Sequence, residues 1–337
     1  MLAPRDNTHV RTMEQLLPHS LSARLDALDL LSRKVLSGKL PGERRSKRRG
    51  RSVEFDDFRQ YVPGDDLRHI DWNILGRLDR LFVKLFREEE DLSLTVLVDA
   101  SPSMNVGTPC KLVYALQLAM AMGYIGLVNQ NRVSAAVFGV PTEDGEDALA
   151  AGLRRLAPMR GRMNTRRLAE FLLGALQAAQ RRSVAPGLDP GATFDDAVRA
   201  LARADSSSLT TGTRGITLVI SDFLLPRPPD SLRLIAGSPT LDTYAVQILS
   251  PGELDPGTLA EEGLVGDLRL TDVETARAQE VTVTPATIAL YRRALDRSVR
   301  ALHDQCARLA IGHVLISTAT PVEDVVTSTL RRGGLLR

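Results

Sequence analysis

The fold is decided by a strand that runs into a polar loop, "LTVLVDASPSM" at residues 94–104. Val96, Leu97 and Val98 are apolar, and two of them are β-branched, which predicts a strand buried in a core. The run then ends in Asp99, Ser101 and Ser103, at alternate positions. Because alternate residues of an extended chain face the same side, we expect the three side-chain oxygens to lie together.

Around this strand, β-rich and helical segments alternate from residue 81 onward, which is typical of a sheet with crossover helices. Strands are expected at 81–86, 92–98, 132–138, 216–221, 243–249 and 313–317. Helices are expected at 111–128, 148–156, 165–180, 194–204 and 285–309, with a hairpin near 266–284. Residues 91–337 are therefore predicted to form a three-layer, Rossmann-like α/β sandwich with a mostly parallel sheet.

Residues 1–90 are predicted to form a separate N-terminal region that packs on this domain. An amphipathic helix is expected over 13–36, because leucines recur there at three- and four-residue spacings. A basic loop follows, with nine Lys or Arg between Arg33 and Arg51. The next segment, 54–72, is rich in acids and aromatics, and Pro63-Gly64 indicates a turn between two extended pieces.

The composition is that of an ordinary globular protein, with 337 residues, 43% hydrophobic residues and a net charge of only +2. Cys110 and Cys306 are far apart, which indicates neither a disulfide framework nor a zinc site and favours a reducing compartment. The most apolar stretch, 112–128, is interrupted by Gln117, so we expect a helix buried within the fold. The N-terminus has no apolar signal core, and we expect a cytoplasmic protein without membrane insertion.

Two further polar residues stand next to predicted elements. Asp222 ends the run "GITLVISDF", and Thr193 stands before a predicted helix in "GATFDDAVRAL". Carboxyl ends of parallel strands collect ligands, and oxygen side chains there suit a hard cation such as Mg²⁺. The isolated pattern Asp99-x-Ser101-x-Ser103 fits equally well a capping turn before the helix at Lys111. The Thr193 hydroxyl likewise suits either a helix cap or an ion.

Together, the DxSxS pattern, the later Gly-x-Thr and the Ser-Asp pair resemble the metal-ion-dependent adhesion site of von Willebrand factor A domains. The resemblance implies that Mg²⁺ or Mn²⁺ is bound by Asp99, Ser101, Ser103, Thr193 and Asp222, with the aspartates acting directly or through water. Thr165, in "GRMNTRRL", is a rival for the threonine role. It lies much further from Asp222 than the family spacing suggests, so Thr193 is preferred.

A narrower resemblance covers almost the whole chain. The stretch "RSVEFDDFRQYVPGDDLRHIDWNILGRLDRLFVKLFREEEDLSLTVLVDASPSM", with the later "LVISDF" and "LTDVET", resembles the bacterial family labelled domain of unknown function fifty-eight. Members are typically encoded beside MoxR-type AAA+ ATPases, and many carry two N-terminal membrane helices, which are not expected here. The chain departs from its relatives at residues 73–76 and at Ala276, away from the expected ion ligands.

This resemblance implies a non-enzymatic, metal-dependent adaptor whose ion holds an acidic residue of a client protein. Its partner would be a MoxR-type ATPase that matures or remodels other proteins. The motifs GxxxxGK[ST], HExxH, GxSxG and GxGxxG are absent from the sequence.

Two other functions stay open at this point. A magnesium-dependent phosphoester hydrolase is the alternative, since Asp99 beside Mg²⁺ suits phosphoryl chemistry, although Ser101 stands where a second acid would be useful. A nucleic-acid-associated protein is the third possibility, through the basic residues 44–51. That run contains no interleaved aromatics, so we favour a solvated or partner-facing loop and expect no nucleic acid.

Overall fold

The computed structural model describes residues 10–32, 54–63, 67–78, 80–87, 92–140, 153–181, 190–209, 214–236, 241–257, 266–271 and 278–336. The chain divides into two compact units, one of Met1–Lys39 with Leu92–Arg337 and one of Leu40–Asp91. The N-terminal helical segment therefore belongs to the main unit, and not to a separate region of residues 1–90. It does so because Leu16, Leu21 and Leu25 are buried in the main hydrophobic core.

The main unit is built on a six-stranded sheet. The strand order is β10 (Gly312–Ser317), β7 (Leu241–Leu249), β6 (Arg214–Ser221), β3 (Leu92–Asp99), β4 (Arg132–Phe138) and β5 (Arg154–Met159). All neighbours are parallel except β5, which pairs antiparallel with β4 at one edge. The predicted α/β fold with a mostly parallel sheet is confirmed.

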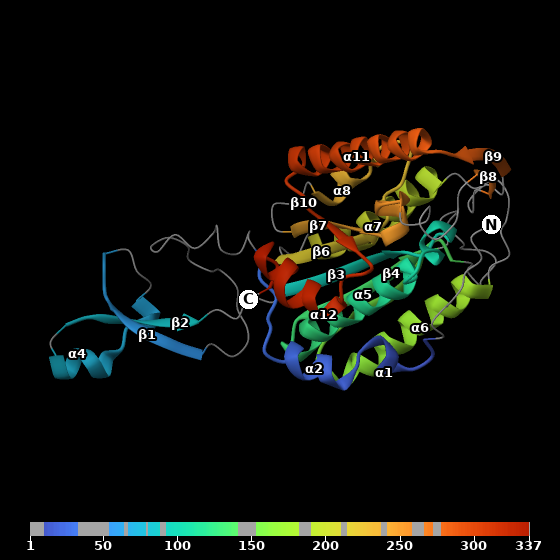
Figure 1. The fold of residues 1–337 in the computed structure, drawn as a ribbon. Helices are drawn as coiled ribbons and strands as arrows, with labels where there is room; N and C mark the ends of the chain where they lie inside the picture. Colours follow the sequence, from blue (N-terminus) through green and yellow to red (C-terminus); the bar gives the residue numbers. More distant parts are fainter. Residues whose placement is uncertain are drawn as a thin grey trace. The chain divides into compact units, whose positions relative to one another are not determined.

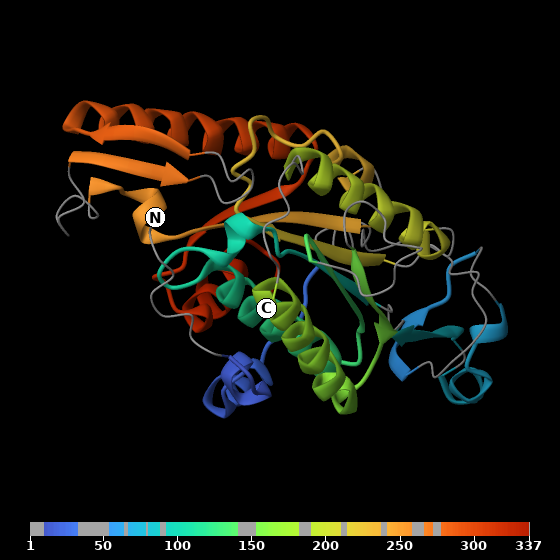
Figure 2. The same ribbon diagram turned by 90° about the vertical axis from the view of Figure 1, so that its right-hand side faces the viewer.

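Helices cover both faces of this sheet (Figures 1 and 2). One face carries α1 (Met13–Leu16), α2 (His19–Leu25), α5 (Lys111–Val128), α6 (Thr165–Arg181) and α12 (Val322–Asp324). The other carries α7 (Pro190–Leu209), α8 (Leu232–Ala236) and α11 (Pro285–Arg308). Strands β8 (Gly266–Thr271) and β9 (Ala278–Val283) pair antiparallel where the sequence predicts a hairpin. Shorter elements are η2 (Pro102–Asn105), η3 (Arg162–Asn164), α9 (Pro251–Leu254) and a π-helix, η4 (Val325–Leu330).

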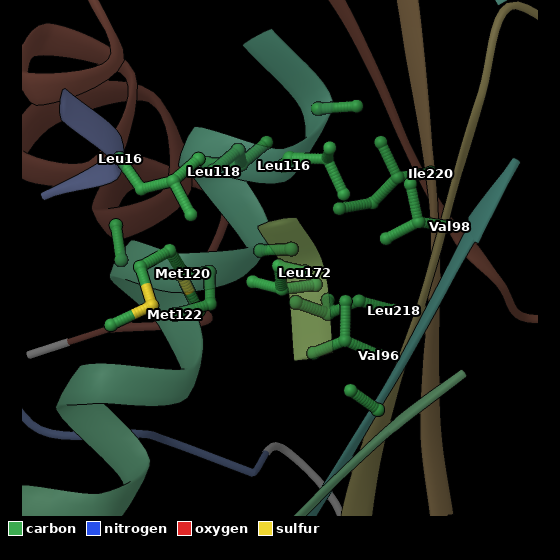
Figure 3. Packing of buried hydrophobic residues seen from close by; sticks show 14 of the residues in the cluster. Leu16, Val96, Val98, Leu116, Leu118, Met120, Met122, Leu172, Leu218 and Ile220 are labelled. Atoms are coloured by element: carbon green, nitrogen blue, oxygen red, sulfur yellow. The ribbon is translucent and has the colours of Figure 1, made fainter. Parts of the chain in front are cut away.

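Helix α5 lies at the centre of the larger core and is apolar on nearly every side. Figure 3 shows that Leu116 faces the sheet residues Val98 and Ile220, while Leu118 lies beside Leu16 of α1. Among the described residues, α5 is long and apolar enough to cross a membrane, but 89% of it is buried inside the protein. The sequence prediction that this stretch forms a helix buried within the fold is confirmed.

The predicted helix over 13–36 is wrong in its continuity, because two short helices, α1 and α2, form in its place. Pro18 separates them, since proline has no N–H to donate and disfavours helical backbone in the residue before it. Leu17, Leu21, Leu25 and Leu28 are nevertheless buried. Residues 33–36 lie outside the described part of the chain.

After α2 the chain pairs with its own end. Leu30 forms an antiparallel bridge with Leu336, and the Leu31 N–H donates to the Leu335 carbonyl at 2.8 Å. Segments about 300 residues apart are therefore joined by backbone pairing. Leu335 and Leu336 are both buried.

The helix predicted over 148–156 is wrong in its described part. Residues 148–152 lie outside the described residues, and Arg154–Met159 forms strand β5. Pairing with β4 outweighs the helical preference of an Ala-, Leu- and Arg-rich run. Pro158 is compatible with this position, because proline within a sheet is found on edge strands.

The smaller unit contains β1 (Glu54–Gln60) paired antiparallel with β2 (Phe82–Arg87). Between them lie η1 (Leu67–His69), where the sequence predicts an extended piece, and a helix, α4 (Trp72–Leu78). The Asp71 carboxylate caps α4, since it accepts the N–H groups of Asn73 at 2.9 Å and Ile74 at 3.3 Å. The basic loop, 33–51, lies outside the described residues.

Candidate functional site

The candidate site lies where the strand order of the sheet reverses. β3 and β6 are neighbours, and the chain leaves β3 toward β4 but leaves β6 toward β7, in opposite directions along the sheet. In open α/β sheets, ligands bind outside the carboxyl ends of the strands at such a switch point. Asp99 ends β3, Ser221 ends β6, and Asp222 follows Ser221 at this edge.

Asp99 is buried, and its carboxylate ties the ends of the two central strands together. Its Oδ1 accepts the N–H of Ser101 at 2.8 Å, and its Oδ2 accepts the hydroxyl of Ser221 at 2.7 Å. The Ser221 Oγ in turn accepts the N–H of Phe223 at 3.1 Å. Asp99 is therefore fixed in place by both loops.

The two serines of the loop after β3 come together as the sequence predicts for alternate positions. The Oγ atoms of Ser101 and Ser103 lie 3.0 Å apart. The Ser101 backbone lies close to Gly139, which follows β4 and has a φ of +78°. A Cβ on Gly139 would lie 2.7 Å from the Ser101 nitrogen, so only glycine leaves room for this loop.

Asp222 is also buried, and its partner is a lysine that sequence reasoning did not single out. The Lys111 Nζ lies 2.8 Å from Asp222 Oδ2 and 2.5 Å from Glu253 Oε1. The other Asp222 oxygen accepts the N–H of Leu224 at 3.1 Å. The Asp222 carbonyl accepts a hydrogen bond from the Gln247 side chain at 2.8 Å.

Thr193 lies at the same edge of the sheet, in the first turn of α7. The helix begins at Pro190, so Thr193 is inside it and does not precede it as predicted. The next residue, Phe194, packs its ring 5.5 Å from both Phe138 and Phe223. Because Phe138 ends β4 and Phe223 follows β6, the start of α7 packs at the carboxyl ends of these two strands.

The rival threonine, Thr165, lies elsewhere. Its hydroxyl donates to the Arg162 carbonyl at 2.6 Å, at the start of α6. This helix follows β5, whose last residue, Met159, pairs with Val133 near the beginning of β4. Thr165 is therefore at the opposite end of the sheet from Asp99.

The electrostatics of the site follow from two buried acids close together. Burial, together with the charge of Asp222, raises the pKa of Asp99 to about 7. Burial alone would lower the pKa of Lys111, but Asp222 and Glu253 outweigh it and hold that pKa above its usual value. Lys111 is thus a charged group in the interior, and Asp99 is the acid without an ammonium partner among the contacts described above.

Lys111, Glu253 and Ser221 were each marked in the sequence by a signal that could have identified them. Lys111 is the one charged residue of the 18-residue apolar helix α5, and a buried lysine requires an acidic partner. Glu253 is the fourth residue of a Ser-x-x-Glu capping box that begins at Ser250. Ser221 stands beside Asp222 at the predicted strand end, where its hydroxyl reaches Asp99.

The donor set fits a small hard cation. Within the described residues, no group of three or more His, Cys, Asp or Glu is placed to hold a metal ion. A site here therefore depends on hydroxyl oxygens as well as carboxylates. Adjacent ligands of an octahedral Mg²⁺ lie about 3.0 Å apart, given Mg–O bonds of about 2.1 Å, and the two serine oxygens also lie 3.0 Å apart.

The fold and this edge define an α/β protein with buried acids and hydroxyls gathered at the switch point of a mostly parallel sheet. Residues 57–303 match the family described as Protein of unknown function DUF58, and the chain belongs to that family. The family resemblance seen in the sequence is thereby confirmed.

The mycobacterial proteins that this chain resembles are described as uncharacterised. The proteins Mb1516 of Mycobacterium bovis and Rv1480 of Mycobacterium tuberculosis are each 28% identical over 295 residues, covering 83% of this chain and 81% of the relative. Among solved structures, the pilus adhesin SpaC from Lactobacillus rhamnosus GG matches with a TM-score of 0.41 and 11% identity. That match covers 73% of this chain and 31% of the adhesin, and it is too weak to inform function.

Proposed function

We propose that this protein is a metal-dependent protein-binding adaptor of the von Willebrand factor A type. Mg²⁺ or Mn²⁺ is held by Asp99, Ser101, Ser103, Thr193 and Asp222. The observation that carries the proposal is the meeting of the Asp99 loop, with its two serine oxygens 3.0 Å apart, and buried Asp222 at one edge of the sheet.

The residues of the chain prepare this site in different ways. Ser221 fixes the Asp99 carboxylate, and Gly139 leaves room for the Ser101 backbone. Most of the remaining ligands are neutral hydroxyls, which compensate little of the charge of a divalent ion. When bound, the ion supplies a strong local positive charge that holds an incoming carboxylate.

The strand order supports the von Willebrand type, with β3 central and only the edge strand β5 antiparallel. The partners follow from the family resemblance. They are a MoxR-type AAA+ ATPase and a client that presents an acidic residue, in the cytoplasm. Binding, and not turnover, is the proposed activity.

The first test is the melting temperature with and without divalent ions. A ligand that binds only the folded state at 100 times its Kd adds about 2.7 kcal/mol, which raises the Tm of a unit of this size by about 4–5 °C. We expect MgCl2 or MnCl2 to produce this rise and Asp99→Ala to abolish it. Asp255→Ala, which removes an exposed acid paired with Arg292, is the matched control and retains the rise. If neither MgCl2 nor MnCl2 raises the Tm of the wild-type protein, the proposal is refuted.

The second test is capture of the ATPase. Immobilised wild-type protein is expected to retain a MoxR-type ATPase in MgCl2 and to release it in EDTA. Asp99→Ala is expected to retain none, while Asp255→Ala behaves as wild type. Equal capture by wild type and Asp99→Ala would place the ATPase contact away from this site.

A further inference from the structure

Lys111 occupies a position where a charged lysine lowers the free energy of unfolding unless acidic partners compensate it. It is the first residue of α5, and its side chain has no exposed surface. The N-terminal end of a helix carries a partial positive charge, which disfavours a lysine there. Removing an ammonium from water adds a desolvation penalty, which only well-placed acids offset.

Two carboxylates from different loops hold this ammonium, because Asp222 follows β6 and Glu253 lies in α9. Asp222 contacts it at 2.8 Å and Glu253 at 2.5 Å. Glu253 is itself fixed, because its other oxygen accepts both the N–H and the hydroxyl of Ser250, at 2.8 and 2.9 Å. The Tyr291 hydroxyl donates to the Glu253 carbonyl at 3.0 Å. Lys111 is therefore held in one position and cannot turn toward solvent.

These contacts change the charge that a bound ion meets. Asp222 has both oxygens engaged by the chain, one by Lys111 and one by the Leu224 N–H. Asp99 receives only neutral donors, from Ser101 and Ser221. The ammonium thus compensates one of the two acids assigned to the ion and leaves the other uncompensated.

We propose that Lys111 is a positioning residue that lowers the negative charge around a bound divalent ion, from three carboxylates to a net charge that the ion can balance, so that the ion can still hold a partner's carboxylate. This inference rests on the proposed function. Asp99, Asp222, Glu253 and Lys111 together carry a formal charge of −2, which one divalent ion balances. Lys111 therefore weakens the hold of the chain on the ion and increases the need for an acidic ligand from outside.

The test is a titration of each purified full-length variant with MnCl2, with free Mn²⁺ measured by electron paramagnetic resonance. Lys111→Met removes a positive charge and is expected to bind Mn²⁺ at least about tenfold more tightly. Glu253→Gln removes a negative charge and is expected to bind at least about threefold more weakly. The double variant restores the charge and is expected to bind within about threefold of wild type. Lys84→Met, which breaks the Lys84–Asp71 pair of the smaller unit, is the control.

The outcomes separate this inference from the proposed function. If wild type binds Mn²⁺ and folded Lys111→Met binds equally or more weakly, the role of Lys111 is overturned and the proposed function stands. If Lys111→Met does not fold, Glu253→Gln decides, and an unchanged affinity overturns the inference. If only Lys111→Met binds Mn²⁺, the lysine effect is supported and the proposed function of the wild type fails. If neither protein binds, both fail.

Discussion

Gly139→Ala tests whether the loop after β4 shapes the candidate site. The φ of Gly139 is +78°, and a Cβ would lie 2.7 Å from the Ser101 nitrogen and 3.0 Å from its Cα. A non-glycine residue in the left-handed region costs about 1–2 kcal/mol, and overpacking adds about 1–3 kcal/mol. We therefore expect the free energy of unfolding to fall by about 2–5 kcal/mol.

The assay is urea unfolding followed by far-UV circular dichroism, with Mn²⁺ affinity as a second readout. Because the clash is with backbone and not with a flexible side chain, Ser101 has to move, and we expect Mn²⁺ affinity to fall by about tenfold or more. The control is Gly174→Ala within α6, where a Cβ would meet only the end of Arg154 at 3.9 Å. That change is expected to stabilise the protein by about 0.5–1 kcal/mol. A Gly139→Ala protein that loses less than about 0.5 kcal/mol and keeps its Mn²⁺ affinity would refute this reasoning.

Two further predictions concern stability. Ser221→Ala removes the donor to Asp99 and the acceptor of the Phe223 N–H, so urea unfolding should show a loss of about 1–3 kcal/mol; a loss under about 0.3 kcal/mol would contradict it. Burial, with His303 nearby, lowers the pKa of His313 to about 4 from 6.5. The folded state then binds fewer protons than the unfolded state between these values, so stability should fall as the pH drops from 6.5 to 4. Partial solvent screening reduces this loss to about 1–2 kcal/mol. His313→Gln should remove this part of the dependence of the free energy of unfolding on pH. If the variant has the same dependence as the wild type, the prediction is wrong.

Much of the fold could be predicted because its strands and long helices have strong local patterns. The predicted bounds of α5 and β4 agree with the structure, and those of β3, β6, β7 and β10 agree within two residues. The failures arise where one residue or one tertiary pairing outweighs the pattern. Pro18 divides a leucine-periodic segment, and β5 forms from a run with helical composition because the edge of β4 offers hydrogen-bond partners.

The site could be predicted only in part, for a physical reason. Asp99, Ser101 and Ser103 are close in sequence, so an extended loop is enough to bring their oxygens together. Lys111 and Glu253 are 142 residues apart, and no local pattern links them. Their meeting depends on how α5 and the loop after β7 pack against β6, which is a property of the whole sheet.

The pairing of Leu30 and Leu31 with Leu335 and Leu336 bears on how this protein is made in the cell. Residues 30–31 are synthesised well before residues 335–336, so this pairing forms only after both have been translated. Until then the core formed by α5 and the leucines of α1 and α2 lacks Leu335 and Leu336 and is partly exposed to solvent. A variant that lacks Leu335 and Leu336 should therefore be degraded more quickly than the wild type.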